Sequence, residues 1–96
     1  MLRVDCSENQ GTTTIRLQGR LVAEFAKLVR DLVMRSAIHR RLIIDLSEVL
    51  FVDEVGEDVL TWLKRIGSAF WADNSYSLDI CERLELPLAN QIRRRP

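Results

Sequence analysis

The apolar residues of this chain change their spacing near Leu21, and the change predicts a fold that mixes strands with helices. Before that point, residues 2–6 and 13–18 alternate apolar and polar side chains, which is the period of strands with one wet face. Residues 7–11 are turn-forming and predict that these two strands make a hairpin. From Leu21 onward the apolar residues recur at helical spacing and predict an amphipathic helix with an apolar stripe, namely Leu21, Val22, Phe25, Leu28, Val29, Leu32 and Val33.

A nearly continuous apolar run, residues 42–46, predicts an interior strand that is covered more fully than its neighbours. Residues 47–52 are expected to be a short connection with buried side chains. A second helix should begin at Asp53 or Glu54 and end within residues 67–71. Its apolar side should comprise Val59, Leu60, Leu63, Ile66 and Phe70.

Residues 77–81 alternate again and predict a fourth strand. The order is then strand, strand, helix, strand, helix, strand. Strand-helix-strand connections are almost always right-handed, so two successive crossovers in one direction place both helices on one face of the sheet. We therefore predict one α/β domain over residues 1–96, with a four-stranded mixed sheet, helices on one face, and a short helix or frayed basic tail at residues 86–96.

Composition excludes several function classes. Lys plus Arg and Asp plus Glu each total 14, so no overall field favours nucleic acid or an anionic membrane. No apolar run approaches the roughly 20 residues that cross a bilayer. Cys6 and Cys81 occur without a secretory signal or a disulfide-dense pattern, which predicts buried reduced thiols and a cytoplasmic location.

Residues 44–56, Ile-Asp-Leu-Ser-Glu-Val-Leu-Phe-Val-Asp-Glu-Val-Gly, carry the most specific pattern in the chain. They resemble the signature of STAS domains (sulphate transporter and anti-sigma factor antagonist), in which a strand ending in Asp-Leu-Ser leads through an apolar turn to Asp-Ser-Ser-Gly or Asp-Ser-Thr-Gly at the start of a helix. Residues 17–21, Leu-Gln-Gly-Arg-Leu, are similar to the family's Leu-x-Gly-Arg-Leu segment before the first helix. The element order resembles that of the family over residues 1 to about 86.

The resemblance implies a non-catalytic protein-interaction module, an adaptor of the anti-sigma-factor-antagonist type in bacterial signalling. In the family, a kinase that also restrains a sigma factor phosphorylates the Ser after the Asp. The phosphate adds about −1.5 to −2 charge at a helix N-terminus. Here that position is Glu54, which has no hydroxyl group, and Val22 stands where the family commonly has Asp. The usual switch should be absent, so either Glu54 imitates the charged state or the partner needs no switching.

The resemblance also indicates where a partner would bind and what it would be. The expected partner is an anti-sigma kinase-like regulator, and the alternative is the ATPase subunit of a lipid-trafficking ABC transporter, which small STAS proteins accompany. Homodimer formation stays open. The expected partner-binding residues are Gly19, Arg20, Val22, Asp53, Glu54, Val55, Gly56 and Glu57.

Four carboxylates lie at the predicted start of the second helix, and two interpretations of their role stay open. They belong to Asp53, Glu54, Glu57 and Asp58. The acids form a docking patch for a partner's cations, or Asp53 caps the helix and the others complement its dipole. Carboxylates also suit Mg²⁺, but nothing else in the sequence supports a metal or a cofactor.

No catalytic constellation is evident in the sequence. The single histidine, His39, follows the first helix in a basic stretch, where it complements the negative end of the dipole. Gly19 and Gly56 stand alone and form no phosphate-binding loop. Trp62 fits either the periphery of the core or an interface. We therefore predict that the protein is not an enzyme.

Overall fold

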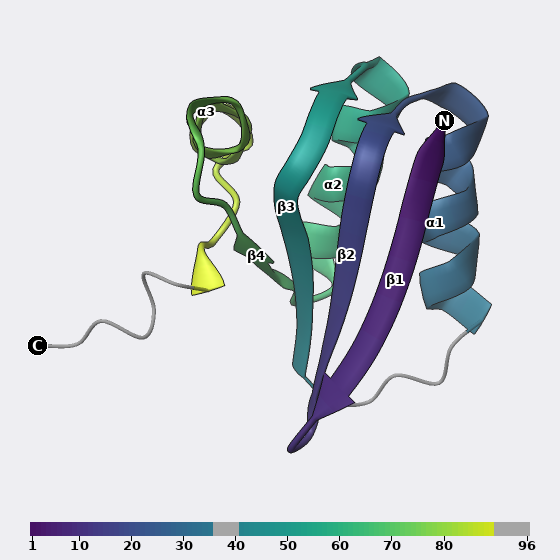
Figure 1. Ribbon diagram of the computed structural model, residues 1–96, viewed down its shortest axis with the longest axis vertical. Helices are drawn as coiled ribbons and strands as arrows, with labels where there is room; N and C mark the ends of the chain where they lie inside the picture. The colour runs from purple at the N-terminus through teal and green to yellow at the C-terminus, as the bar shows by residue number, and fades with distance from the viewer. Residues whose placement is uncertain (36–40, 90–96) are drawn as a thin grey trace, which may run out of the picture.

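The computed structural model describes residues 1–35 and 41–89, which form a four-stranded mixed sheet and three helices (Figure 1). Strand β1 is antiparallel to β2, whereas β2 and β3, and β3 and β4, are parallel, in the order β1-β2-β3-β4. This confirms the predicted fold class. The elements are β1 (Leu2–Asn9), β2 (Thr12–Leu21), α1 (Ala23–Arg35), β3 (Arg41–Val52), α2 (Glu54–Arg65), β4 (Ala69–Trp71) and α3 (Ser75–Leu84).

The hydrophobic core lies between one face of the sheet and helices α1 and α2, which lie side by side behind it (Figure 1). In α1 the buried residues are Ala26, Val29 and Val33. Phe25 and Leu28 were predicted to be part of the buried stripe, and this was wrong, since they are 37% and 58% exposed. The core side chains from the strands and α2 include Ile15, Leu17, Leu21, Leu42, Ile44, Leu46, Val59, Leu60 and Leu63.

Strand β3 is longer than predicted, because residues 47–52 continue the strand instead of forming a connection. Its register with β2 shifts twice. Gly19 pairs with Val49 and the next residue, Arg20, pairs with Phe51, so β3 holds one extra residue, Leu50. A bulge of this kind re-aims side chains at the end of a strand. Leu50 and Phe51 are exposed as a result, contrary to the predicted burial of this segment.

The segment after α2 differs from the prediction. The helix ends at Arg65, and the Gly67 N–H donates to the Lys64 carbonyl with Gly67 at φ 102°, a conformation that glycine adopts without strain. The chain then forms β4 from Ala69 to Trp71, which was predicted to be the end of the helix.

The predicted strand at residues 77–81 is wrong, because these residues lie in α3. The Asn74 side chain caps this helix by accepting the Ser77 N–H at 2.8 Å, and the Ser77 hydroxyl reaches back to the Asn74 backbone, which is a capping box. Ser77, Ile80 and Cys81 are buried together, at helical spacing. Five alternating residues are too few to separate the two periods, so the cap was the better signal.

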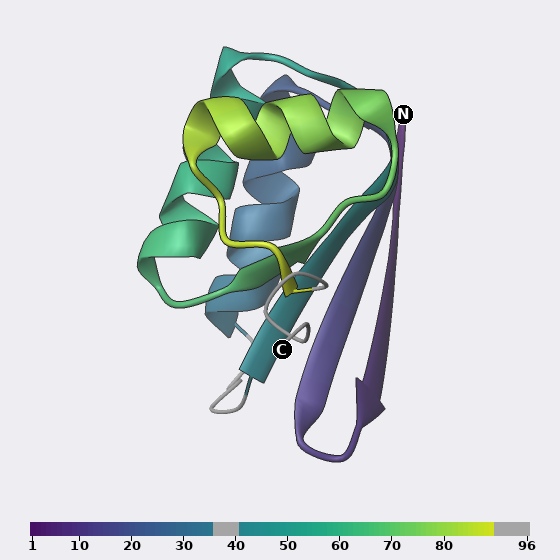
Figure 2. The same cartoon turned by 90° about the vertical axis from the view of Figure 1, so that its left-hand side faces the viewer.

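Helix α3 runs crosswise to the strands and covers the part of the β3 edge that β4 leaves unpaired (Figure 2). The Val52 N–H donates to the Tyr76 hydroxyl oxygen at 2.9 Å, and the Asn74 amide donates to the Ser47 carbonyl at 2.6 Å. These bonds supply partners for backbone groups of β3 that would otherwise be open.

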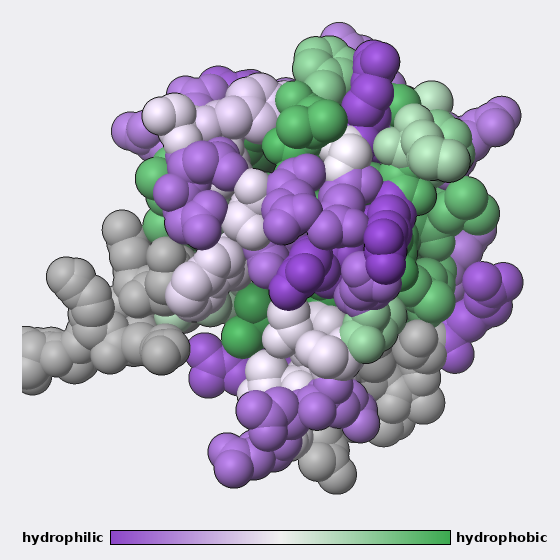
Figure 3. Space-filling model, in the orientation of Figure 1, coloured by the Kyte–Doolittle hydropathy of each residue, from purple (hydrophilic) through white to green (hydrophobic). Residues whose placement is uncertain are grey.

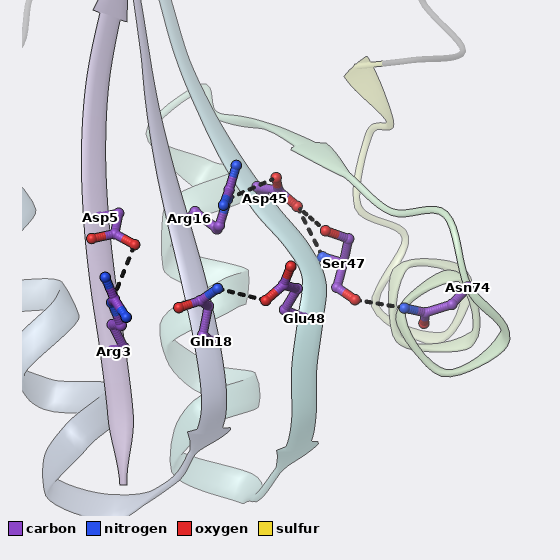
Figure 4. A network of polar contacts seen from close by, with 8 residues as sticks. All are labelled: Arg3, Asp5, Arg16, Gln18, Asp45, Ser47, Glu48 and Asn74. Atoms are coloured by element: carbon purple, nitrogen blue, oxygen red, sulfur yellow. Dashed lines mark hydrogen bonds and ion pairs between the residues drawn. The ribbon is translucent and has the colours of Figure 1, made fainter.

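The other face of the sheet is polar (Figure 3). Figure 4 shows the contacts on it, some within one strand and some between β2 and β3. Arg3 pairs with Asp5 at 3.5 Å, and Arg16 pairs with Asp45 at 3.8 Å. The Gln18 amide donates to the Glu48 carboxylate. The second strand therefore has one buried face and one polar face, as its alternation predicted.

Both cysteines are free, but only Cys81 is buried, whereas Cys6 is exposed on the hairpin, contrary to the prediction.

Within residues 1–35 and 41–89, no helix is long and apolar enough to cross a membrane. The interpretations of His39 and of the basic tail beyond Ala89 concern residues outside the described ranges.

Candidate partner-binding site

The two sequence motifs meet at one end of the sheet. Strands β2 and β3 are parallel neighbours, so their carboxyl ends lie at the same edge, and Leu21 pairs with Val52 there. The Asp53 N–H donates to the Leu21 carbonyl at 3.4 Å, which joins the start of α2 to the end of β2. The predicted site residues from both motifs, Gly19 to Val22 and Asp53 to Glu57, are thereby brought together.

Asp53 holds this junction by capping α2 and tying it to α1. Its Oδ1 atom accepts the Gly56 N–H at 2.8 Å, and its backbone is extended, as in a typical N-cap. Its Oδ2 atom accepts the Ala23 N–H at 3.1 Å, at the first residue of α1. The capping interpretation is therefore correct for Asp53, whose two carboxylate oxygens bind helix N-termini.

Gly19 and Gly56 position the backbone at the same end of the sheet. A Cβ on Gly56 would lie 2.2 Å from the Leu21 carbonyl oxygen and 2.7 Å from Cγ1 of Val52, so only glycine lets α2 approach β2 this closely. Gly19 has φ 110°, and a Cβ there would lie 2.5 Å from the Met1 carbonyl oxygen. Both glycines shape the site without offering a side chain to a partner.

Of the carboxylates at the start of α2, Glu54 and Asp58 are exposed and Glu57 is partly buried. Glu57 accepts a hydrogen bond from Arg83 of α3 at 3.1 Å. Arg83 also pairs with Asp79 at 3.4 Å, and the bonds to Glu57 and Asp79 raise its pKa above the usual value. Arg83 therefore partly neutralises the acidic patch, whose exposed carboxylates are those of Glu54 and Asp58.

Val22 and Val55 are only partly exposed, and Val55 packs against the core, so these two expected contacts offer little surface. Arg20 is exposed, and its guanidinium carbon lies 5.4 Å from the centre of the Phe51 ring, within the range of a cation–π contact. The arginine therefore holds an aromatic ring at the surface near Glu54.

The sequence reasoning missed two residues of this surface, Leu50 and Phe51, which we call the apolar rim. They are 73% and 45% exposed at the bulged end of β3. The sequence did contain a sign of exposure here. Residues 49–52 are four consecutive apolar residues, and a strand that is covered on one face buries only every second side chain. In Figure 3, hydrophobic side chains gather at this upper end of the sheet.

The described residues offer little for chemistry. Burial raises the pKa of the Cys81 thiol from 9.0 to about 11, so it stays protonated and unreactive near neutral pH. Among residues 1–35 and 41–89, no three His, Cys, Asp or Glu side chains are grouped to hold a metal ion. Trp62 packs against the core beneath the Arg30 guanidinium, 5.7 Å from its ring centre.

The fold and this site define a class of small α/β domains that present a helix N-terminus between two strand ends. A family model described as STAS domain matches residues 3–66, so the chain belongs to the STAS family. No curated protein matches the chain.

Solved structures with low sequence identity share the fold. The unphosphorylated anti-sigma factor antagonist SpoIIAA is 15% identical, with a TM-score of 0.67 over 88% of this chain and 82% of that one. A SpoIIAA-like protein of the DUF3478 family from Shewanella loihica PV-4 is 11% identical, with a TM-score of 0.59 over 91% and 80%. The murine anion transporter Slc26a9 is 22% identical, with a TM-score of 0.57, and the match covers 80% of this chain but only 14% of the transporter.

Proposed function

We propose that this chain is a non-catalytic protein-interaction module of the anti-sigma-factor-antagonist type, in which residues 1–96 act as one cytoplasmic domain. Its partner is a bacterial signalling protein such as an anti-sigma kinase-like regulator. The binding surface comprises Arg20, Glu54 and the apolar rim. The membership of the STAS family and the likeness to SpoIIAA support this assignment.

The observation that carries the proposal is the exposure of Glu54 as the first residue of α2, beside an exposed apolar rim. A helix N-terminus bears roughly half a positive charge, so a carboxylate there is stabilised. Glu54 supplies one negative charge permanently, where a phosphoserine would supply about −1.5 to −2. The exposed leucine and phenylalanine supply the apolar contact area on which protein recognition depends. The negative charge of this surface is therefore permanent and does not depend on phosphorylation.

Capture of partners on the immobilised chain tests the proposal. We expect wild-type protein to capture a signalling protein from an extract of its own source, and Leu50→Ser to reduce the capture at least several-fold. Leu78→Ser is a matched control, because Leu78 is also exposed, at 40%, but lies on α3. Equal capture by the wild type and both variants would contradict the assignment of the surface.

The role of Glu54 has its own test. If its charge imitates a phosphorylated state, Glu54→Ser should bind a captured kinase more tightly and become phosphorylated by it, measured by calorimetry and mass spectrometry. Glu54→Gln, which removes the charge without adding a hydroxyl, should bind more tightly but accept no phosphate. Equal affinity of all three proteins would exclude the imitation.

The second candidate is a small subunit of a lipid-trafficking ABC transporter, with the same surface placed against an ATPase subunit. Two observations favour it: Glu54 cannot be phosphorylated, and part of a membrane transporter, Slc26a9, is similar in fold to this chain. Co-purification with an ATP-binding subunit and a permease, in place of a sigma regulator, would select this candidate.

A further inference from the structure

We propose that two copies of this chain pair through their β1 strands, antiparallel, in the register that places the two Val4 residues opposite each other. Strand β1 is an edge strand of eight residues, from Leu2 to Asn9. Its partner on one side is β2, and within residues 1–35 and 41–89 no strand pairs with its outer side. An edge of this length presents a row of backbone donors and acceptors to any strand that fits it.

The opposite edge of the sheet is protected. Helix α3 covers β3 through its bonds to Ser47 and Val52. The Phe70 N–H of β4 donates to the Pro87 carbonyl at 2.8 Å, and Phe70 forms a bridge with Leu88. The fold therefore covers one edge with its own chain and leaves the β1 edge available for pairing.

The charges of β1 select a second copy as the partner and fix the register. Arg3 and Asp5 lie on the open face of the sheet, where they pair with each other at 3.5 Å, and their side chains are 74% and 49% exposed, so each carboxylate and guanidinium can also be reached by a second chain. In a two-fold arrangement centred on Val4, Arg3 of each copy lies directly opposite Asp5 of the other, so both pairs are attractive. A centre on Arg3 or on Asp5 would place that residue opposite its own copy, and like charges at opposed positions are repulsive.

The face of β1 that is turned toward the helices supplies apolar side chains to the same proposed interface. Leu2 and Val4 point toward the helices and are only partly buried. On α1, Arg30 lies over the Trp62 ring and so marks the flank of the helix that faces α2. The helical period places Phe25 on the opposite flank, which faces the β1 side of the sheet. Figure 3 shows hydrophobic side chains along this side of the molecule. Pairing of the β1 strands would bring the two exposed α1 flanks, with Phe25 and Leu28, toward each other.

A charge-exchange experiment tests both the interface and the register. Wild-type protein should be a dimer by light scattering as its concentration rises. Arg3→Asp places only carboxylates at the opposed positions and Asp5→Arg only cations, so each variant should be monomeric. A mixture of the two variants should again dimerise, because every opposed pair is then attractive. The double variant R3D/D5R should dimerise like the wild type.

Disulfide formation gives an independent measure of the register. In a Cys6→Ser background, Val4→Cys should form a covalent dimer on mild oxidation, because the two Val4 positions are directly opposite. Wild-type protein should not crosslink through Cys6, which the register places opposite Leu2. Circular dichroism of each variant, including Val4→Cys at a partly buried position, checks that the substitutions leave the fold intact.

The proposal is overturned if the wild type stays monomeric at every concentration, or if R3D or D5R alone dimerises as well as the wild type. It is also overturned if wild-type protein crosslinks through Cys6 more readily than the Val4→Cys variant crosslinks through its introduced thiol. None of these variants alters Glu54 or the apolar rim. Failure of dimerisation therefore leaves the proposed partner binding intact, and failure of partner capture leaves the dimer intact.

Discussion

Replacing Gly56 with alanine should destabilise the protein, although the same change usually stabilises a helix. Alanine is favoured over glycine in a helix by about 1 kcal/mol. At this position the added Cβ would lie 2.2 Å from the Leu21 carbonyl oxygen and 2.7 Å from the Val52 side chain. The carbonyl belongs to β2 and also accepts the Asp53 N–H. The start of α2 must therefore move away from the sheet.

The size of the effect follows from these opposing contributions. Overpacking of a folded interior costs about 1–3 kcal/mol, and contact with a backbone atom places this case at the upper end. Subtracting the gain in helix propensity leaves a net loss of about 2 kcal/mol. For a chain of this size, that corresponds to a fall in Tm of about 8–16 °C.

Thermal and urea unfolding, followed by circular dichroism, measure the change. Gly67→Ala is the matched control, because a Cβ at Gly67 would meet nothing within 4 Å, although its φ of 102° still opposes a side chain. The control reports backbone strain without a steric contact. A Gly56→Ala variant that melts at or above the wild-type temperature would refute the close approach of α2 to β2.

Further substitutions and a thiol-labelling experiment test other parts of the fold. Tyr76→Phe removes the acceptor of the partly buried Val52 N–H, so stability should fall by about 1–3 kcal/mol, and unchanged hydrogen exchange at the Val52 amide would contradict this. Asp53→Ala should cost about 1–2 kcal/mol and Asp53→Asn less, because the amide keeps an acceptor for the helix, as urea unfolding can show. A thiol reagent at neutral pH should label exposed Cys6 quickly and Cys81 only after unfolding; two fast thiols would refute the burial. Because burial raises the pKa of Cys81 from 9.0 to about 11, the unfolded thiol ionises first, so stability should fall as pH rises through that window, and Cys81→Ala should remove this part of the fall.

The candidate site could be predicted only in part. The cap at Asp53 and the start of α2 were predictable, because capping is a local interaction between residues three apart. The run of four apolar residues at 49–52 indicated that part of it would be exposed, but not that Leu50 and Phe51 would be the exposed pair, because that depends on a bulge that forms only when β3 pairs with β2. The bond between Arg83 and Glu57 was not predictable either, since α3 had to be placed before these residues could meet.

By itself, the sequence determined the elements with a strong local period: the hairpin, both core helices and the interior strand, because the spacing of apolar residues decides which side of each element can be buried. The tertiary structure decided where the C-terminal part lies. Residues 77–81 suit a strand or a helix by their pattern; the local cap at Asn74 favours a helix, and the bond from the Asn74 amide to the Ser47 carbonyl places this helix on the open edge of β3. Three residues from Ala69 become a strand only because Ile43 to Asp45 offer them a parallel partner. In segments this short, the intrinsic preference of the residues for helix or strand is too weak to determine the conformation, so it is determined by pairing with distant parts of the chain.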